Sequence, residues 1–184
     1  MAMTGLLVCF DQATKMYIHT QLTLGQEIVV WDNFFNITYV RNYGAAFGIL
    51  RDLQEDYRNL FFLLMPPIAL VIIIFILKGV PERDKATVFA LSSVFGGAVG
   101  NYIDRVRFRY VIDFLDFYVP KDTVPFSMIG LSDWPATRAY HWPAFNIADI
   151  GIVCGVCLLI MIEIKRMWEA KPENSDAPEE AAST

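Results

Sequence analysis

The sequence predicts an α-helical integral membrane protein with four transmembrane helices. The chain of 184 residues is 55% hydrophobic and only 19% charged, and its mean hydropathy is +0.39. Soluble domains usually carry about 25% charged residues. The apolar residues are also gathered into long uncharged segments, as membrane-spanning helices require. The length favours a single domain, which we expect to cover residues 1–170.

Three segments have the length and composition of membrane spans. Residues 60–77 and 86–103 contain no charged side chain, and residues 143–162 contain one, Asp149. A helix rises about 1.5 Å per residue, so each segment can nearly cross a hydrocarbon core of about 30 Å. With their flanking residues, these segments predict spans at residues 58–78, 85–105 and 143–166.

A fourth span, at residues 2–20, has weaker support from hydropathy. Its apolar sequence is interrupted by Asp11 and Lys15. These two residues are spaced i, i+4, so their opposite charges can neutralise each other on one helix face. The segment lacks the basic start and the small-residue cleavage site of a typical signal peptide. The alternative is an amphipathic helix that lies in the membrane interface.

Two long connections, residues 21–56 and 106–142, join the predicted spans. The first contains a strand-like run at residues 34–40, followed by a turn at Gly44. With four spans, both connections lie on one side of the membrane and both termini on the other. The side of the termini carries the basic residues Lys78, Arg83, Lys85, Lys165, Arg166 and Lys171. The positive-inside rule makes that side cytoplasmic and the two connections extracytoplasmic.

The end of the chain differs from the rest in composition. Residues 171–184 are rich in Pro, Glu, Ala and Ser, which predicts a disordered cytoplasmic tail. This acidic tail carries much of the net charge of −5. Since no basic face of the required size is present, we expect no nucleic-acid partner.

Polar residues interrupt the predicted spans near one side of the membrane. Charged groups at the centre of a span cost roughly 2.5 kcal/mol or more each, so a sequence that keeps them usually uses them. Asn101 and Arg105 share a helix face at the end of the third span, and Asn146 and Asp149 share one at the start of the fourth. Asp113 lies just beyond the third span. We expect these groups to meet at the outer membrane boundary.

Two carboxylates in one poorly hydrated site share a proton, and such a pair can activate water for amide hydrolysis. The sequence contains no HExxH motif, and His19 and His141 are isolated. Cys154 and Cys157 form a CxxC, but they lie in an apolar run, where cysteine behaves as an inert hydrophobic residue. We therefore expect neither a metal nor a cofactor.

The same residues also have simpler explanations. Asp104 is better explained by a structural ion pair or an interfacial anchor than by catalysis. Asn42 can also be explained by the turn before Gly44, and Asn146 by a helix N-cap. An Asp within a span can equally serve a transporter or a proton relay. From these residues alone, an aspartic hydrolase and a small proton-coupled transporter that uses the Asp and Arg cluster are equally favoured.

Five sequence blocks, in order, resemble those of the lipoprotein signal peptidases, also called type II signal peptidases. They are DQATK at residues 11–15, RNYGAAF at 41–47, GAVGNYIDR at 97–105, VIDF at 111–114 and FNIAD at 145–149. Any one block alone is weak support. Their order and their spread over most of the chain make the resemblance specific.

The resemblance implies an aspartic endopeptidase of the bacterial inner membrane that cleaves diacylglyceryl-modified prolipoproteins just before the lipidated cysteine. It implies a small extracytoplasmic β-sheet, formed largely by the first long connection, a monomeric state, and contact with membrane lipids. The catalytic pair falls on Asp113 and Asp149. The substrate-binding positions fall on Asn42, Gly44, Asn101, Arg105 and Asn146. The block with Asp11 and Lys15 supports the site structurally, as we also expect of Asp104.

The connection between Asp113 and Asp149 is longer than the resemblance leads us to expect. Its extra length, residues 119–142, is rich in proline and aromatic residues. We expect it to form a lid on the outer face or a helix on the membrane surface.

Overall fold

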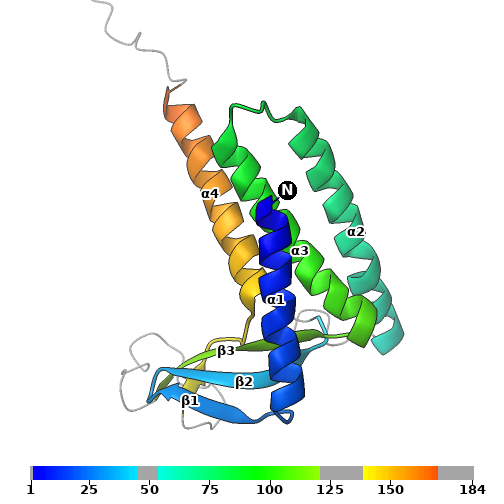
Figure 1. Cartoon of the computed structure of the whole chain (residues 1–184), viewed down its shortest axis with the longest axis vertical. Helices are drawn as coiled ribbons and strands as arrows, with labels where there is room; N and C mark the ends of the chain where they lie inside the picture. Colours follow the sequence, from blue (N-terminus) through cyan, green and yellow to red (C-terminus); the bar gives the residue numbers. More distant parts are fainter. Residues whose placement is uncertain (1, 45–53, 121–138, 170–184) are drawn as a thin grey trace, which may run out of the picture.

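The computed structural model describes residues 2–44, 54–120 and 139–169. The elements are α1 (Ala2–Gln21), β1 (Glu27–Trp31), β2 (Phe35–Asn42), α2 (Glu55–Gly79), α3 (Lys85–Phe108), β3 (Val111–Pro120), β4 (Ala139–His141) and α4 (Ile147–Glu169). The four helices gather into a bundle, and a small sheet lies across one end of it (Figure 1). We call this the sheet end, and we call the opposite end, where residues 80–84 join α2 to α3, the loop end.

Three helices among the described residues are long and apolar enough to cross a membrane. They are α2, α3 and α4, and the most apolar 18 residues of each have mean hydropathies of 3.0, 1.3 and 2.4. Only 6% of this stretch is buried in α2, against 50% in α3, so α3 is the central helix of the bundle. The helix α4 begins at Ile147 rather than Pro143, because the backbone of Phe145 pairs with that of Leu115.

The helix α1 lies alongside α3, and its N-terminus is beside the middle of that helix (Figure 1). The hydroxyl of Thr4 donates a hydrogen bond of 3.1 Å to the carbonyl of Ser92. Asp11, Lys15 and Ile18 form its buried face. This helix is not among the three that hydropathy identifies as spans. The predicted helix is therefore confirmed, while the count of four spans stays a prediction.

Glycines on α3 and α4 let these two helices approach closely. A Cβ atom at Gly97 would lie 2.3 Å from the carbonyl oxygen of Ala148. A Cβ atom at Gly155 would lie 2.7 Å from the carbonyl oxygen of Ala90. Any larger residue at these positions must push the two helices apart.

The sheet is antiparallel throughout, in the order β1-β2-β3-β4. The predicted strand at residues 34–40 corresponds to β2. The expectation that the first connection forms most of the sheet is wrong, because each connection contributes two strands. The strand β3 directly follows α3 and contains two Asp residues within an apolar run, so its sequence lacks a clear alternating pattern.

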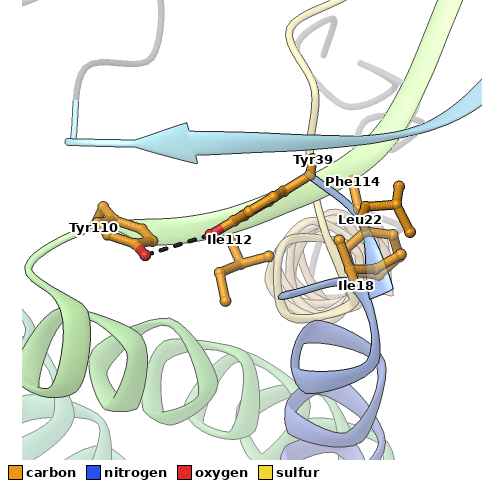
Figure 2. Packing of buried hydrophobic residues seen from close by; sticks show 6 residues of the cluster. All are labelled: Ile18, Leu22, Tyr39, Tyr110, Ile112 and Phe114. Atoms are coloured by element: carbon orange, nitrogen blue, oxygen red, sulfur yellow. Dashed lines mark hydrogen bonds between the residues drawn. The ribbon is translucent and has the colours of Figure 1, made fainter. Parts of the chain in front are cut away.

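A hydrophobic cluster fixes the sheet to the helices (Figure 2). Ile18 and Leu22, at the end of α1, pack with Tyr39 of β2 and with Ile112 and Phe114 of β3. All five side chains are buried. The cluster therefore fixes β3, which carries Asp113, against the sheet end of the bundle.

Some predictions fall outside the described residues. They concern the tail at 171–184, most of the extra length at 119–142, and the Ala-Ala-Phe of the second sequence block.

Replacement of Gly155 by Ala should destabilise the protein. The added methyl group would meet the α3 backbone, and overpacking of this kind typically costs about 1–3 kcal/mol. Gly5→Ala is the matched control, because a Cβ at Gly5 meets no atom within 4 Å. Thermal unfolding of the purified protein in detergent checks this. A midpoint for Gly155→Ala at or above that of Gly5→Ala would contradict the close packing.

Candidate active site

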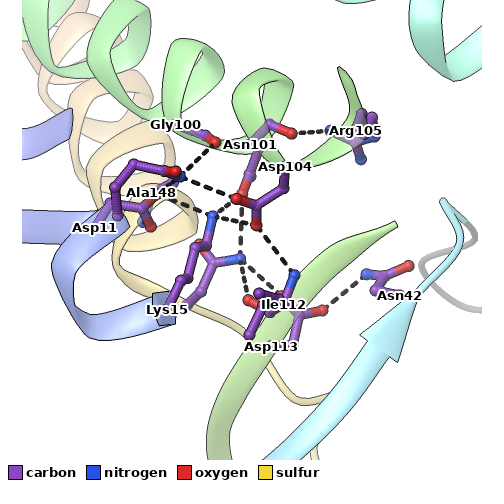
Figure 3. A network of polar contacts seen from close by, with 12 residues as sticks. Asp11, Lys15, Asn42, Gly100, Asn101, Asp104, Arg105, Ile112, Asp113 and Ala148 are labelled. Carbon is purple, nitrogen blue, oxygen red and sulfur yellow. Dashed lines mark hydrogen bonds and ion pairs between the residues drawn. The ribbon is translucent and has the colours of Figure 1, made fainter. Parts of the chain in front are cut away.

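The polar residues predicted to meet do meet, at the sheet end of the bundle. They come from α1, α3, the start of α4, and β2 and β3, and their contacts form one continuous network (Figure 3). The network lies where the central helix α3 ends and the chain turns directly into β3. The packing of α1 and α4 against α3 therefore brings together network residues that lie far apart in the sequence.

The start of α4 is closed by a reciprocal pair of hydrogen bonds between Asn146 and Asp149. The backbone N–H of Asp149 donates to Oδ1 of Asn146, and the backbone N–H of Asn146 donates to Oδ2 of Asp149, both at 3.0 Å. This is a capping box, in which each side chain satisfies a backbone donor that the helix leaves free. The N-cap interpretation of Asn146 is therefore confirmed, and the cap also fixes the carboxylate of Asp149.

Asn146 does more than cap the helix, because its side-chain amide also contacts the other carboxylate. Its Nδ2 donates to Oδ1 of Asp113 at 2.7 Å. Nδ2 of Asn42 donates to the other oxygen, Oδ2, of Asp113 at 2.9 Å. Both oxygens of Asp113 are thus held by amides from two different elements, and Asn146 contacts both Asp113 and Asp149.

Asn101, on α3, joins the two helices at the same point. Its Nδ2 donates to Oδ1 of Asp149 at 2.8 Å. Its Oδ1 accepts from Asn146 at 3.1 Å and from Nζ of Lys15 at 2.8 Å. Because an ammonium group can only donate, Lys15 fixes the orientation of the Asn101 amide and so directs its N–H groups toward Asp149.

Lys15 is fully buried between α1 and α3. Its ammonium lies 2.9 Å from Oδ2 of Asp11 and 3.1 Å from Oδ2 of Asp104. With the bond to Asn101, its three N–H donors face three acceptors. Asp104 also accepts from the backbone N–H of Ile112, at the start of β3. The predicted ion pair of Asp104 therefore exists, with Lys15 as its partner.

Asp113 and Asp149 have different surroundings. Asp113 is 2% exposed, whereas Asp149 is half-buried. Burial and then the nearby negative charge of Asp149 raise the pKa of Asp113 to about 7, against the opposing hydrogen bonds from Asn42 and Asn146. Asp113 thus holds a proton up to near-neutral pH, beside a carboxylate that is less deeply buried.

Within the described residues, Arg105 and Gly44 make no direct hydrogen bond to Asp113 or Asp149. The guanidinium of Arg105 donates to the carbonyl of Asn101 at 3.4 Å and lies over the ring of Phe62. Gly44 has a φ of 110°, and its N–H donates to Oδ1 of Asn42. A Cβ at Gly44 would overlap the Phe62 ring, at 2.2 Å. Gly44 therefore shapes the turn that positions Asn42.

Gln12 belongs to the network, although sequence reasoning assigned it no role. Its Nε2 donates to Asp104 Oδ1 at 2.9 Å, to the Gly100 carbonyl at 3.1 Å and to Asp11 Oδ2 at 3.2 Å. The backbone N–H of Ala148 also donates to Asp11. The signal that could have identified Gln12 is its place in the DQATK block, one residue after Asp11.

This arrangement can hydrolyse an amide bond. One carboxyl group is buried and holds a proton, and the other accepts hydrogen bonds and is partly open to water. Such a pair can use one member as a general base toward water while the other donates a proton or a hydrogen bond to a carbonyl. Among the residues that the structure describes, no three His, Cys, Asp or Glu side chains gather as a metal site would require.

Comparisons with known proteins identify the family of this chain. Residues 3–165 match the family model described as signal peptidase (SPase) II. The chain is 41% identical over 165 residues to the lipoprotein signal peptidase of Syntrophus aciditrophicus, covering 90% of this chain and 91% of that protein. It is 43% identical over 162 residues to that of Geobacter sulfurreducens, covering 88% and 89%.

Two solved structures are also similar. A bacterial membrane enzyme solved by the in meso method at 2.3 Å has a TM-score of 0.71 and 31% identity, covering 99% of this chain and 93% of its own. Another at 1.9 Å resolution has a TM-score of 0.68 and 32% identity, covering 89% and 91%. With a family match over most of its length, this multi-pass membrane protein belongs to the signal peptidase II family.

Proposed function

We propose that this protease is an aspartic endopeptidase in which Asp113 and Asp149 form the catalytic pair. The observation that carries the proposal is that Asn146 contacts both carboxylates while Asn42 and Asn101 each hold one of them. Three side-chain amides therefore orient the two carboxyl groups. A structural ion pair needs no such orientation, whereas general acid–base catalysis does.

The two aspartates take different roles in this mechanism. Asp149, which is partly open to water, removes a proton from a water molecule as its oxygen attacks the carbonyl carbon. Asp113, which holds a proton, donates a hydrogen bond to the carbonyl oxygen as it becomes negative. Asp149 then gives the proton that it took from water to the amide nitrogen as the C–N bond breaks and the carbonyl forms again, which leaves Asp113 with its own proton. Metal ions and nucleophilic side chains have no part in these steps.

The substrate we propose is a prolipoprotein that carries a diacylglyceryl group on the cysteine after the scissile bond. The relatives from Syntrophus and Geobacter are named lipoprotein signal peptidases. The carboxylates lie at the sheet end of apolar helices, where a lipid anchor would hold the peptide at the membrane boundary. The guanidinium of Arg105 can donate several hydrogen bonds there to a carbonyl or ester oxygen of the substrate, and Gly44 can shape the adjoining part of the binding site. We infer that the chain works as a monomer.

We further propose that the protein lies in the bacterial inner membrane with its sheet end outside. Basic residues follow α2 and α4 at the loop end, which by the positive-inside rule faces the cytoplasm. On this basis α1 is a fourth span whose charges are neutralised against α3, and both termini are cytoplasmic. The transporter alternative is not favoured, because Asp113 lies on a strand outside the helices that could form a path.

Replacement of either Asp113 or Asp149 by Asn should abolish processing while the protein still folds. Asn keeps the shape of Asp but cannot act as a general base or carry the shared proton. Conversion of a purified lipidated precursor to its mature form measures the activity. Asp116→Asn is the control, because Asp116 is equally buried on β3 but contacts His141 instead of the pair. Full processing by Asp113→Asn or Asp149→Asn would remove that residue from the mechanism.

The activity should fall as the pH rises through about 7. Asp113 must be protonated to donate its hydrogen bond, and its pKa of about 7 means that the proton is lost above that value. The same raised pKa makes the folded protein bind this proton more tightly than the unfolded chain, so its contribution to stability is also lost with rising pH. A profile of kcat/KM against pH tests this. An activity that keeps rising between pH 7 and 9 would show that Asp113 acts without its proton.

Lys15→Met should be strongly destabilising. It would leave Asp11 and Asp104 buried without their counter-charge, a loss that typically costs about 3–5 kcal/mol. Lys165→Met is the control, since its pair with Glu169 is exposed and such pairs contribute about 1 kcal/mol or less. The measurement is the thermal unfolding midpoint in detergent. Equal midpoints for the two variants would mean that the buried network contributes little to stability.

A further inference from the structure

A cavity with both polar and apolar lining opens at the sheet end, between the start of α2 and the end of α3. Its volume is about 290 Å³, and it is lined by Asp56, Asn59, Leu60 and Leu63 of α2 and by Arg109, which follows α3. These two helix ends lie side by side at the sheet end (Figure 1). None of these five residues takes part in the network around Asp113 and Asp149.

Arg109 has an unusual backbone. Its φ is 67°, in the left-handed region, where it caps the end of α3 with its N–H on the carbonyl of Arg105. Glycine is the usual residue at such a position, because any side chain there is strained. The strained backbone therefore marks Arg109 as a candidate for a functional role.

One polar atom of the cavity lining lacks a partner. Oδ1 of Asn59 is buried without a hydrogen bond. The described part of the chain shows no ion pair between Asp56 and Arg109, although both line the same cavity. A cation and an anion that face one cavity without pairing leave room for a ligand that carries both charges.

We propose that this cavity binds the headgroup of an aminophospholipid of the surrounding membrane. The phosphate contacts Arg109, the ammonium contacts Asp56, and Oδ1 of Asn59 accepts a further hydrogen bond from the ammonium. One acyl chain then runs along Leu60 and Leu63 on the exposed face of α2. The site lies at a helix end of a membrane protein, which is the level of lipid headgroups.

The charges distinguish this ligand from the lipidated substrate. A diacylglyceryl group is neutral, so it offers neither a phosphate for Arg109 nor an ammonium for Asp56. A purely anionic lipid would meet Arg109 favourably but would be repelled by Asp56. In the lining of the main cavity, the one guanidinium and the one carboxylate therefore fit a zwitterion with a primary ammonium.

The cavity also adjoins the candidate active site. A narrow extension is lined by Arg105, Phe62 and Tyr43 and shares Asn59, Leu63 and Arg109 with the main cavity. A bound headgroup would therefore lie next to Arg105, on the side away from the carboxylates. The main cavity itself does not include Arg105, and a test of lipid binding there does not depend on the proposed catalysis.

The test measures lipid binding by the purified full-length protein. Native mass spectrometry in detergent would follow titration with phosphatidylethanolamine and, separately, with phosphatidylglycerol. We expect Arg109→Gly to weaken phosphatidylethanolamine binding about ten-fold or more, since it removes a charge-assisted contact. Its thermal midpoint should stay equal or rise, because glycine relieves the strained backbone. Arg107→Ala is the control, since that side chain points to Met16 and Phe108 instead.

A second variant tests the charge pairing itself. Asp56→Asn should weaken phosphatidylethanolamine binding and strengthen phosphatidylglycerol binding, so that the preference between the two lipids reverses. The proposal is overturned if Arg109→Gly binds phosphatidylethanolamine as well as Arg107→Ala does. It is also overturned if Asp56→Asn leaves the preference unchanged, or if the unmodified protein prefers phosphatidylglycerol.

Discussion

The buried ammonium of Lys15 is the interaction on which the rest of the site depends. It lies 2.9 Å from Asp11, 3.1 Å from Asp104 and 2.8 Å from Asn101. Each acceptor then holds another element: Asp11 accepts from the start of α4, Asp104 from the start of β3, and Asn101 donates to Asp149. A single cation in an apolar bundle thus fixes α1, α3, α4 and β3 relative to one another, because leaving any of these groups unpaired would be costly.

Asn146 caps a helix and also positions both candidate catalytic carboxylates. As an N-cap it satisfies the first turn of α4, and through the reciprocal bond it fixes Asp149. Its amide, already oriented by this cap, can then reach Asp113. The alternatives that the sequence leaves open for Asn146 therefore do not compete. The same holds for Asn42, whose Oδ1 closes the turn to Gly44 while its Nδ2 holds Asp113.

The sequence predicts the helices and the members of the site well, because charges in an apolar run are easy to recognise. Asp149 and Lys15 were found in this way. It predicts the sheet poorly, because β3 and β4 derive their pairing from distant partners and not from their own pattern. Gln12 and the backbone donors of Ile112 and Ala148 were missed for a similar reason. Their roles arise only when α1, α3 and α4 are packed together.

The position of β3 explains why the two aspartates can differ. Asp149 extends into the site from the first turn of α4, within the helix bundle. Asp113 instead lies on a strand and is 2% exposed. Burial raises the pKa of Asp113, while Asp149, in the first turn of α4, is half-buried. In the proposed mechanism, an acid and a base of the same residue type therefore follow from one carboxyl group on a buried strand and one at the start of a helix.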